Sequence, residues 1–258
     1  MLELQANYSR RITRPSGHAL NPFVDYSDVY TIRYGNPNLK PEYSDLFELG
    51  TIHNIFGMAI NPSLFYRYTD NVMERYQELL PGGVIGSTYK NMAKSESYGL
   101  EVNLNGPVFK WMRLNADLSY YNYKITGIDS QTETRQDYTW SSRLSFNMFF
   151  SKKLNMQLSG YYTAPTVTSQ GARSEMYSID AGLRYDVLDA LSLTLRASDI
   201  FDTQKFSSNS AGPGFIFDFN MKRQSQTISL GLQYKINQGI KQRERTPKDD
   251  GGKQMDDF

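Results

Sequence analysis

The sequence has no cysteine, no long apolar run and almost no net charge. The absence of cysteine is compatible with a bacterial envelope protein but excludes no compartment. No segment approaches the roughly 20 consecutive apolar residues that a membrane-spanning helix needs, which excludes a helical membrane protein. A formal net charge of +1 argues against a nucleic-acid partner, because the phosphates of nucleic acids require a basic protein surface.

A secretory signal peptide is also absent from the first residues, Met1-Leu-Glu-Leu-Gln5, which have neither a basic nor an apolar region. Apolar and polar side chains alternate from Leu2 to Arg11, so the sequence begins inside a predicted strand. If the protein lies outside the cytoplasm, we expect this sequence to be part of a longer chain.

Aromatic side chains are plentiful although the average composition is polar. The sequence has 19 Tyr and 14 Phe, but its mean hydropathy is only −0.56. Aromatic rings of this kind are favoured where one end of the side chain is apolar and the other end is wet. Their number therefore indicates a protein with extensive apolar–water boundaries.

Residues 96–105 are one of about ten segments in which apolar and polar residues alternate. The apolar face of this predicted strand carries Tyr98, Leu100, Val102 and Leu104. A sheet of such strands must either pack against another layer or face lipid. In a neighbouring segment Pro62 cannot donate a ladder hydrogen bond, so we expect a bulge there.

Short and long connections alternate between these segments. The short ones lie near residues 54, 107, 152 and 188, with the second placed at Gly106-Pro107. Long loops are predicted near 12–40, 72–87, 126–137, 164–174 and 202–214. Residues 215–219 are read as an extension of the last strand or, alternatively, as a short separate strand. Short turns at one rim and long loops at the other are typical of an outer-membrane barrel, whereas a Greek-key sandwich mixes them.

The aromatic residues support this assignment because they gather at the two ends of the predicted strands. The long-loop ends hold Tyr66, Tyr68, Tyr120, Tyr123, Trp140, Tyr162 and Tyr177. The short-turn ends hold Phe56, Trp111, Phe150, Tyr185 and Tyr234. Two aromatic girdles around an apolar band are a property of membrane barrels.

Charged residues within the strands fall on the polar face, which we predict to line the lumen. They are Arg67, Glu101, Arg113, Asp117, Arg143, Asp180, Arg184 and Arg196. A charge facing lipid at the midplane costs about 2–4 kcal/mol, whereas a water-filled lumen accepts it. We expect these groups to be solvated and ion-paired; the alternative is that some of them line a substrate path.

Three local sequences resemble the C-terminal barrel of TonB-dependent outer-membrane transporters. They are Gly35-Asn-Pro-Asn-Leu-Lys-Pro-Glu42, Ser95-Glu-Ser-Tyr-Gly-Leu-Glu101 and Ser198-Asp-Ile-Phe-Asp202. The resemblance implies a barrel of about 22 strands with an N-terminal plug domain. It further implies import of chelated iron, cobalamin, glycans or peptides, with energy passed from the inner-membrane TonB complex through the plug. This sequence departs from the family in lacking a plug and in offering only about ten strands.

We therefore predict an all-β fold: an antiparallel up-and-down transmembrane β-barrel segment of about ten strands over residues 1–236, in the outer membrane of a Gram-negative bacterium. Residues 237–258 are charged and without period, and are predicted to be a disordered tail. Alone, the segment should form a curved sheet with unpaired edges or a strained closed barrel. The expected partners are outer-membrane lipid, the missing plug and strands, and the TonB complex.

No cofactor or metal is expected. The pairs Asp249-Asp250 and Asp256-Asp257 lack the spacing of a calcium loop. Ligand contacts would come from the long loops, where Arg33, Tyr34, Asn36 and Asn38 are the candidates. A purely structural role for the Asn-Pro turn is the preferred alternative for the asparagines.

Two other functions remain open. A barrel enzyme would need a catalytic base at the loop rim, where His18 lies near Asp25 and Asp28 in the sequence; His53 is at the opposite rim. We predict that the protein is not an enzyme, because a loop histidine is more often simply exposed. A soluble carbohydrate-binding sandwich would instead require the apolar faces to pack on each other, and the aromatic girdles argue against it.

Overall fold

A computed structural model describes residues 3–127 and 133–236, so the predicted tail at 237–258 and its aspartate pairs lie outside the described residues. Most of the described chain is β-structure. The helix α1 (Gly17–Leu20) is a single turn capped by Ser16, whose Oγ accepts a hydrogen bond from Ala19 N at 3.2 Å. In the described ranges, no helix has the length and apolar character to cross a membrane.

Ten strands form the continuous antiparallel path of the main sheet. In spatial order they are β1 (Glu3–Thr13), β3 (Glu42–Ile55), β4 (Met58–Leu79), β5 (Ile85–Phe109), β6 (Met112–Gly127), β7 (Arg135–Phe149), β8 (Leu154–Thr163), β11 (Met176–Leu188), β12 (Leu191–Ser198) and β15 (Thr227–Tyr234). The short strand β2 (Thr31–Arg33) pairs in parallel with the upper part of β5. The predicted antiparallel, up-and-down fold is confirmed.

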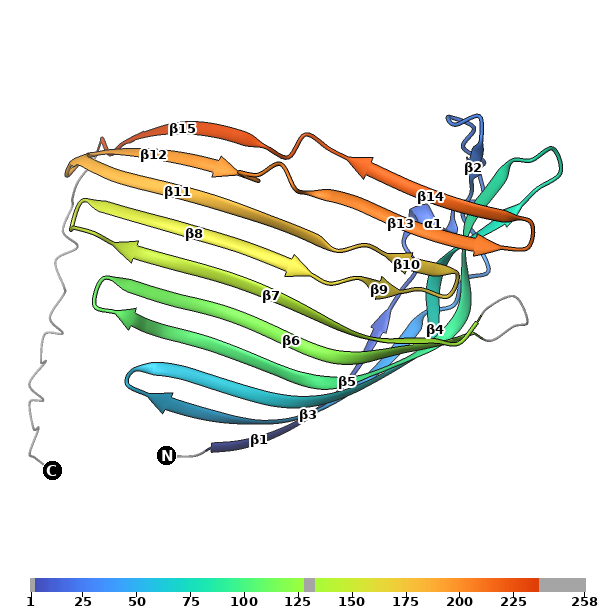
Figure 1. Cartoon of the computed structure of the whole chain (residues 1–258), viewed down its shortest axis with the longest axis horizontal. Coiled ribbons are helices and arrows are strands. Elements are labelled where there is room, and N and C mark those ends of the chain that lie inside the picture. The colour runs from blue at the N-terminus through green and yellow to red at the C-terminus, as the bar shows by residue number, and fades with distance from the viewer. Residues whose placement is uncertain (1–2, 128–132, 237–258) are drawn as a thin grey trace, which may run out of the picture.

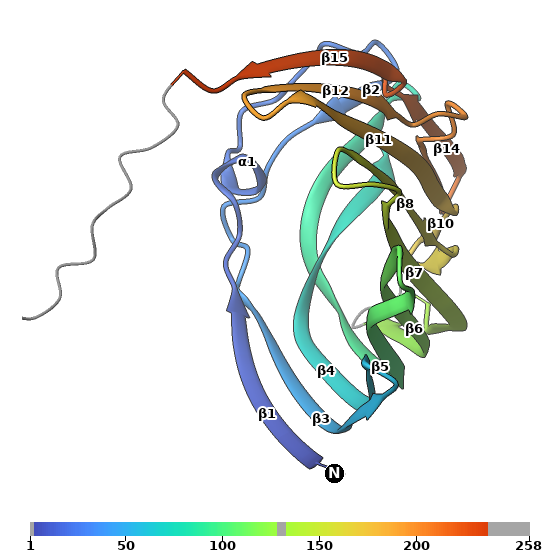
Figure 2. The same ribbon diagram turned by 90° about the vertical axis from the view of Figure 1, so that its left-hand side faces the viewer.

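The main sheet is curved but not closed. Figure 2 shows it as a trough, with β1 and β15 along its two edges. Within the described residues β1 pairs only with β3, and β15 pairs only with β12. All eight residues of β15 are exposed, as are ten of the eleven in β1. Of the two forms predicted for the segment, the structure is therefore the curved sheet with unpaired edges.

A second, four-stranded sheet lies at the end of the trough where the long connections gather (Figure 1). Its order is β14 (Phe215–Lys222), β13 (Lys205–Gly212), β10 (Gly171–Arg173) and β9 (Thr166–Val167). The predicted loop 164–174 thus contains the short strands β9 and β10, most of the predicted loop 202–214 is strand β13, and the separate strand at 215–219 is the correct alternative. A tight turn at Pro213-Gly214 explains the hairpin, because Gly214 has a φ of +81° and proline favours the position before it.

The predicted loop at 72–87 is also mostly strand. β4 continues to Leu79 and β5 begins at Ile85, so the connection is only Leu80–Val84. The register shifts between Thr69 and Val72, where Asn71 has a φ of +56°. This bulge interrupts the ladder and lets the hairpin bend away from the wall of the trough. Within the predicted loop 12–40, β1 extends to Thr13, and α1 and β2 occupy part of the rest.

The bulge predicted at Pro62 is wrong. Pro62 stays in register with Val102 on β5. On its other side the ladder between β4 and β3 is interrupted at Pro62, and it resumes in the same register at the pair of His53 and Ile60. The missing N–H of Pro62 is therefore accommodated by a gap in hydrogen bonding, and not by an inserted residue.

The tight turns lie at the end of the trough opposite the long connections, and they occur at three of the four predicted positions. Phe56 and Gly57 form a two-residue turn with φ values of +51° and +81°, as in a type I′ hairpin. The turn predicted at Gly106-Pro107 is wrong, because β5 continues to Phe109. A Cβ on Gly106 would lie 2.6 Å from Met58 Cα, so this glycine permits close approach of the neighbouring hairpin.

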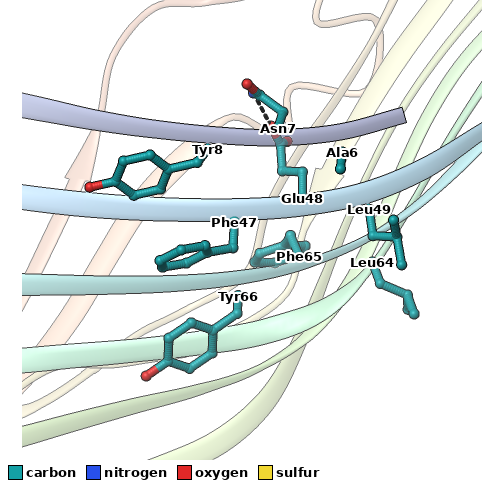
Figure 3. Close-up of a pocket in the computed structure, with 9 residues that line it drawn as sticks. All are labelled: Ala6, Asn7, Tyr8, Phe47, Glu48, Leu49, Leu64, Phe65 and Tyr66. Atoms are coloured by element: carbon teal, nitrogen blue, oxygen red, sulfur yellow. Dashed lines mark hydrogen bonds between the residues drawn. The ribbon is translucent and has the colours of Figure 1, made fainter. Parts of the chain in front are cut away.

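Aromatic rings line up across neighbouring strands on the apolar face. Near the long connections, Trp140, Tyr162 and Tyr177 stack with centroid separations of 4.3 and 6.2 Å. At the β1 edge, Tyr8, Phe47 and Tyr66 project to the same side of three strands, at 4.9 and 6.4 Å (Figure 3). Tyr123 does not belong to this girdle, because the register places it on the opposite face with Tyr121 and Asp117.

Candidate functional site

Four of the eight predicted lumen charges meet on one face of the sheet. Arg67, Glu101, Asp117 and Arg143 come from β4, β5, β6 and β7 and line a cavity of about 370 Å³. Asp117 lies directly opposite Arg143 in the ladder. Asn103 Nδ2 donates a hydrogen bond to Asp117 Oδ1 at 3.1 Å. The four charges follow one another as positive, negative, negative, positive across adjacent strands, which gives a polar, ion-rich surface.

The other four charges lie outside that cavity. Arg184 Nε donates to Asp186 Oδ1 at 3.0 Å, and its Nη2 donates to Ser192 Oγ at 3.0 Å. Asp180 Oδ1 accepts a hydrogen bond from Asp199 N at 2.8 Å. Arg113 and Arg196 are exposed. The polar face therefore contains one charge cluster, one separate ion pair between Arg184 and Asp186, and two exposed arginines.

Among the loop candidates, Arg33 and Tyr34 line a second cavity, of about 380 Å³, beside the upper β4–β5 hairpin. Tyr34 N donates to Ser87 O at 3.1 Å, which continues the parallel pairing of β2 with β5. The Tyr34 hydroxyl donates to Glu78 Oε1 at 3.0 Å. Burial, and then this bond to Glu78, raise the pKa of Tyr34 to about 12. Tyr34 therefore stays protonated at neutral pH and acts as a hydrogen-bond donor.

Asn36 is engaged within the fold, whereas Asn38 is exposed. Asn36 N donates to Ala19 O at 2.7 Å, and Asn36 Nδ2 donates to Tyr89 O at 3.0 Å. Its Oδ1 accepts from Asn38 N at 3.0 Å. Gly35 has to be small, because a Cβ there would lie 2.5 Å from Asn21 O. These contacts favour the structural role for the Asn-Pro turn.

Asn91, which the sequence pattern did not single out, ties this turn to the sheet. Its Oδ1 accepts from Lys40 N at 2.7 Å, and its Nδ2 donates to Lys40 O at 2.9 Å and to Asn71 O at 2.7 Å. One side chain thus holds the connection before β3 and the bulge in β4 together. An asparagine within a strand, where this residue type is depleted, is the only sequence signal that marks the position.

The Ser198–Asp202 sequence forms a buried polar junction after β12. Asp199 is 2% exposed, and its carboxylate accepts hydrogen bonds from Thr203 N at 2.9 Å, Gln204 N at 3.1 Å and the hydroxyl of Ser225. Burial by itself raises the pKa of Asp199, but the bonds from Ser225, Gln204 and Thr203 outweigh it and lower the pKa to about 2. The carboxylate therefore remains ionised and joins β12 to the segment that precedes β15.

His18 does not have the contacts of a catalytic base. It shares the loop cavity with Asp25, but Asp25 Oδ1 accepts from Ser27 N at 2.9 Å, and in the described part of the chain no hydrogen bond joins His18 to Asp25 or Asp28. Near the tight turns, His53 Nε2 instead bonds Thr51 Oγ1 at 2.9 Å. Residues 3–127 and 133–236 contain no group of three His, Asp or Glu side chains able to hold a metal ion.

Known proteins similar to this chain include bacterial transporters and receptors. The vitamin B12 transporter BtuB of Vibrio vulnificus (strain YJ016) is 25% identical over 189 residues, which cover 72% of this chain and 30% of that protein. The siderophore receptor PirA from Pseudomonas aeruginosa is 20% identical, with a TM-score of 0.53 over 79% of this chain and 37% of that one. The ferric yersiniabactin uptake receptor FyuA from Yersinia pestis is 12% identical, with a TM-score of 0.57 over 90% of this chain and 35% of that one.

This chain spans about a third of the length of these relatives: 30% of BtuB, 37% of PirA and 35% of FyuA. The two structural likenesses show the shared fold. The family model described as "Outer membrane protein beta-barrel family" matches residues 1–234. The predictions of a partial barrel and of an outer-membrane location are therefore confirmed, and the chain belongs to the outer membrane protein beta-barrel family.

Proposed function

We propose that this chain is the barrel part of a TonB-dependent transporter that imports a bulky nutrient across the outer membrane. The observation that carries the proposal is the open trough: its concave side holds the charges of Arg67, Glu101, Asp117 and Arg143, while its apolar side is lined by aromatic rows. A barrel wide enough to pass a nutrient needs more strands than this trough contains. The unpaired edges of β1 and β15 are where such strands would join.

The partners in this proposal follow from the same geometry. The apolar face would contact outer-membrane lipid, and the charged concave face would contact a plug domain or the passing substrate. Energy would come from the inner-membrane TonB complex acting through that plug. The similarity to a vitamin B12 transporter, a siderophore receptor and a ferric yersiniabactin uptake receptor supports nutrient import as the general activity.

The test is growth on limiting nutrients. A strain lacking the gene would be compared with the wild type, and with a strain lacking TonB, on ferric chelates, cobalamin, glycans and peptides. We expect growth on one of these nutrients to require both the gene and TonB. Growth that requires the gene but not TonB would contradict the proposal. A hydrolytic activity of the purified protein that disappears in His18→Ala would favour the barrel enzyme instead.

A further inference from the structure

The cavity beside the β4–β5 hairpin is built from segments far apart in the sequence. Its walls are the α1 turn and the residues after it, the end of β2, and the upper parts of β4 and β5, at the end of the molecule with the long connections (Figure 1). Its volume, about 380 Å³, lies within the range of small-molecule sites, which runs from about 300 to 1,000 Å³.

Positive charge predominates in this cavity. Arg33 and Arg75 both line it and are both exposed, and within the described ranges neither guanidinium forms a salt bridge. Among the described residues that line it, the one acidic side chain is Asp25, which lies opposite Arg33 in an antiparallel bridge and whose Oδ1 accepts a hydrogen bond from Ser27 N. Two arginines that form no salt bridge in the part of the chain that the structure describes suit a carboxylate, which can accept two parallel hydrogen bonds from one guanidinium.

Aromatic surface lies next to these charges. Arg75 Cζ is 5.9 Å from the ring centroid of Tyr89, which also lines the cavity. Phe23, at the rim, is 82% exposed. A ligand that places an anion at the arginines would therefore have an apolar or aromatic part within reach of Tyr89 and Phe23.

The walls are held in place without a ligand. Asn36 fixes the turn after β2 to both α1 and β5, and Gly35 packs directly against the backbone of Asn21. Tyr34 is hydrogen-bonded to Glu78. Because the backbone on three sides is tied together, little ordering would be required when a ligand binds.

We propose that this cavity binds an organic carboxylate that carries an aromatic or apolar group, with the carboxylate at Arg33 and Arg75. The inference rests on the proposed transport function, since it identifies the chemical class of one ligand contact on the extracellular side. Within that function it favours an anionic ligand over a neutral one.

The experiment uses the intact protein, extracted from outer membranes in detergent, and two probes of equal shape. 4-Hydroxybenzoate carries a carboxylate, and 4-hydroxybenzamide is its uncharged counterpart. Binding is followed by ligand-observed NMR and calorimetry. We expect the benzoate to bind and the benzamide to bind at least tenfold more weakly. No binding of the benzoate, or equal binding of both probes, would overturn the inference.

Substitutions then locate the site. Arg33→Gln and Arg75→Gln should each weaken benzoate binding about tenfold or more, because each removes a charge-assisted donor. Arg223→Gln, at an exposed arginine outside the cavity, is the matched control and should leave binding unchanged. If Arg75→Gln does not fold, the binding measured with Arg33→Gln tests the site alone, because Arg33 is the last residue of a strand of only three residues. Equal losses in the control and in the two cavity variants would overturn the assignment.

Failure of this inference and failure of the proposed function give different results. TonB-dependent growth without benzoate binding leaves the transporter proposal intact and removes the site. Specific binding without any TonB-dependent growth keeps the site and removes the transporter proposal.

Discussion

Phe65 and Tyr121 meet edge to face across Gly99, with ring centroids 5.9 Å apart and planes inclined by 62°. In the ladder Gly99 is directly opposite Phe65 on β4 and directly opposite Tyr121 on β6. The glycine therefore makes room for two rings to touch over a strand that neither belongs to. This gives a physical reason for the glycine in the Ser95–Glu101 sequence.

Replacing this glycine by alanine should destabilise the sheet. A Cβ on Gly99 would lie 2.3 Å from Tyr120 O and 2.4 Å from Tyr121 Cβ, so β5 and β6 would have to separate. We expect Gly99→Ala to lower the free energy of unfolding by about 1–3 kcal/mol, as is usual for an overpacked site. Urea unfolding of the protein in lipid vesicles measures the change.

Gly182→Ala is the matched control, because Gly182 also lies within a strand, β11, and nothing lies within 4 Å of a Cβ built on it. Its effect should stay within about 0.5 kcal/mol. Equal destabilisation by the two substitutions would show that the loss is a general response of strand glycines and not a consequence of the contact with Tyr121.

The Gln170 side chain should control the docking of the second sheet on β4 of the main sheet. Gln77 N donates to Gln170 Oε1 at 2.8 Å, and Gln170 Nε2 donates to Gln77 O at 2.9 Å. Both residues are buried. Gln170→Ala would leave the backbone groups of Gln77 unpaired, at a cost of about 1–3 kcal/mol per group. We expect faster hydrogen exchange at the Gln77 amide in this variant. Gln157→Ala is the control, because it removes an exposed glutamine from β8 of the main sheet, and it should leave that exchange rate unchanged.

Acid should weaken the junction after β12. The folded-state pKa of Asp199 is about 2, below the ordinary 3.8, so folding favours the ionised carboxylate. Its contribution to stability is thus fully present above about pH 4 and is lost as the pH falls toward 2. In Asp199→Asn this part of the pH dependence should disappear, whereas Asp218→Asn, at an exposed residue of β14, should retain it. Unfolding measured between pH 6 and about 2 compares the three proteins.

A charge on the apolar face should be costly in a membrane. Leu100 lies on β5, is 43% exposed, and shares its face with Tyr98. Leu100→Lys should reduce the free energy of unfolding in lipid vesicles by about 2–4 kcal/mol. Ser119→Lys places the same charge in the polar cavity and should cost far less. Equal costs would contradict the assignment of the two faces.

Local chemistry accounts for what the sequence could predict. Strand alternation and the Phe56-Gly57 turn depend on neighbouring residues, so the antiparallel order and most of the tight turns could be anticipated. The turn predicted at Gly106 and Pro107 is wrong because a glycine that allows close approach of a neighbouring strand looks the same in sequence as a glycine that makes a turn.

Contacts between distant segments could not be anticipated. Gln77 and Gln170 are 93 residues apart, and neither carries a local signal of the contact. The second sheet depends on β10 pairing with β13 across the intervening strands β11 and β12, so it too lies beyond the reach of periodicity. For the candidate site, the sequence identified Arg33 and Tyr34 but not Arg75, because the cavity forms where the segment that holds Arg33 lies against the distant β4–β5 hairpin.

The order of the main sheet has a consequence for its assembly. Apart from the small β2, each strand of the main sheet pairs with the strand that precedes it on the path, so the strands join in the order in which they occur in the chain. Such a sheet can grow by addition of one hairpin at a time, with a modest loss of chain entropy at each step. Long connections precede the pairing of both outermost strands, because β1 ends at Thr13 and β3 begins at Glu42, and β12 ends at Ser198 and β15 begins at Thr227. Closing these connections costs the most chain entropy, so β1 and β15 should acquire protection from proteases last.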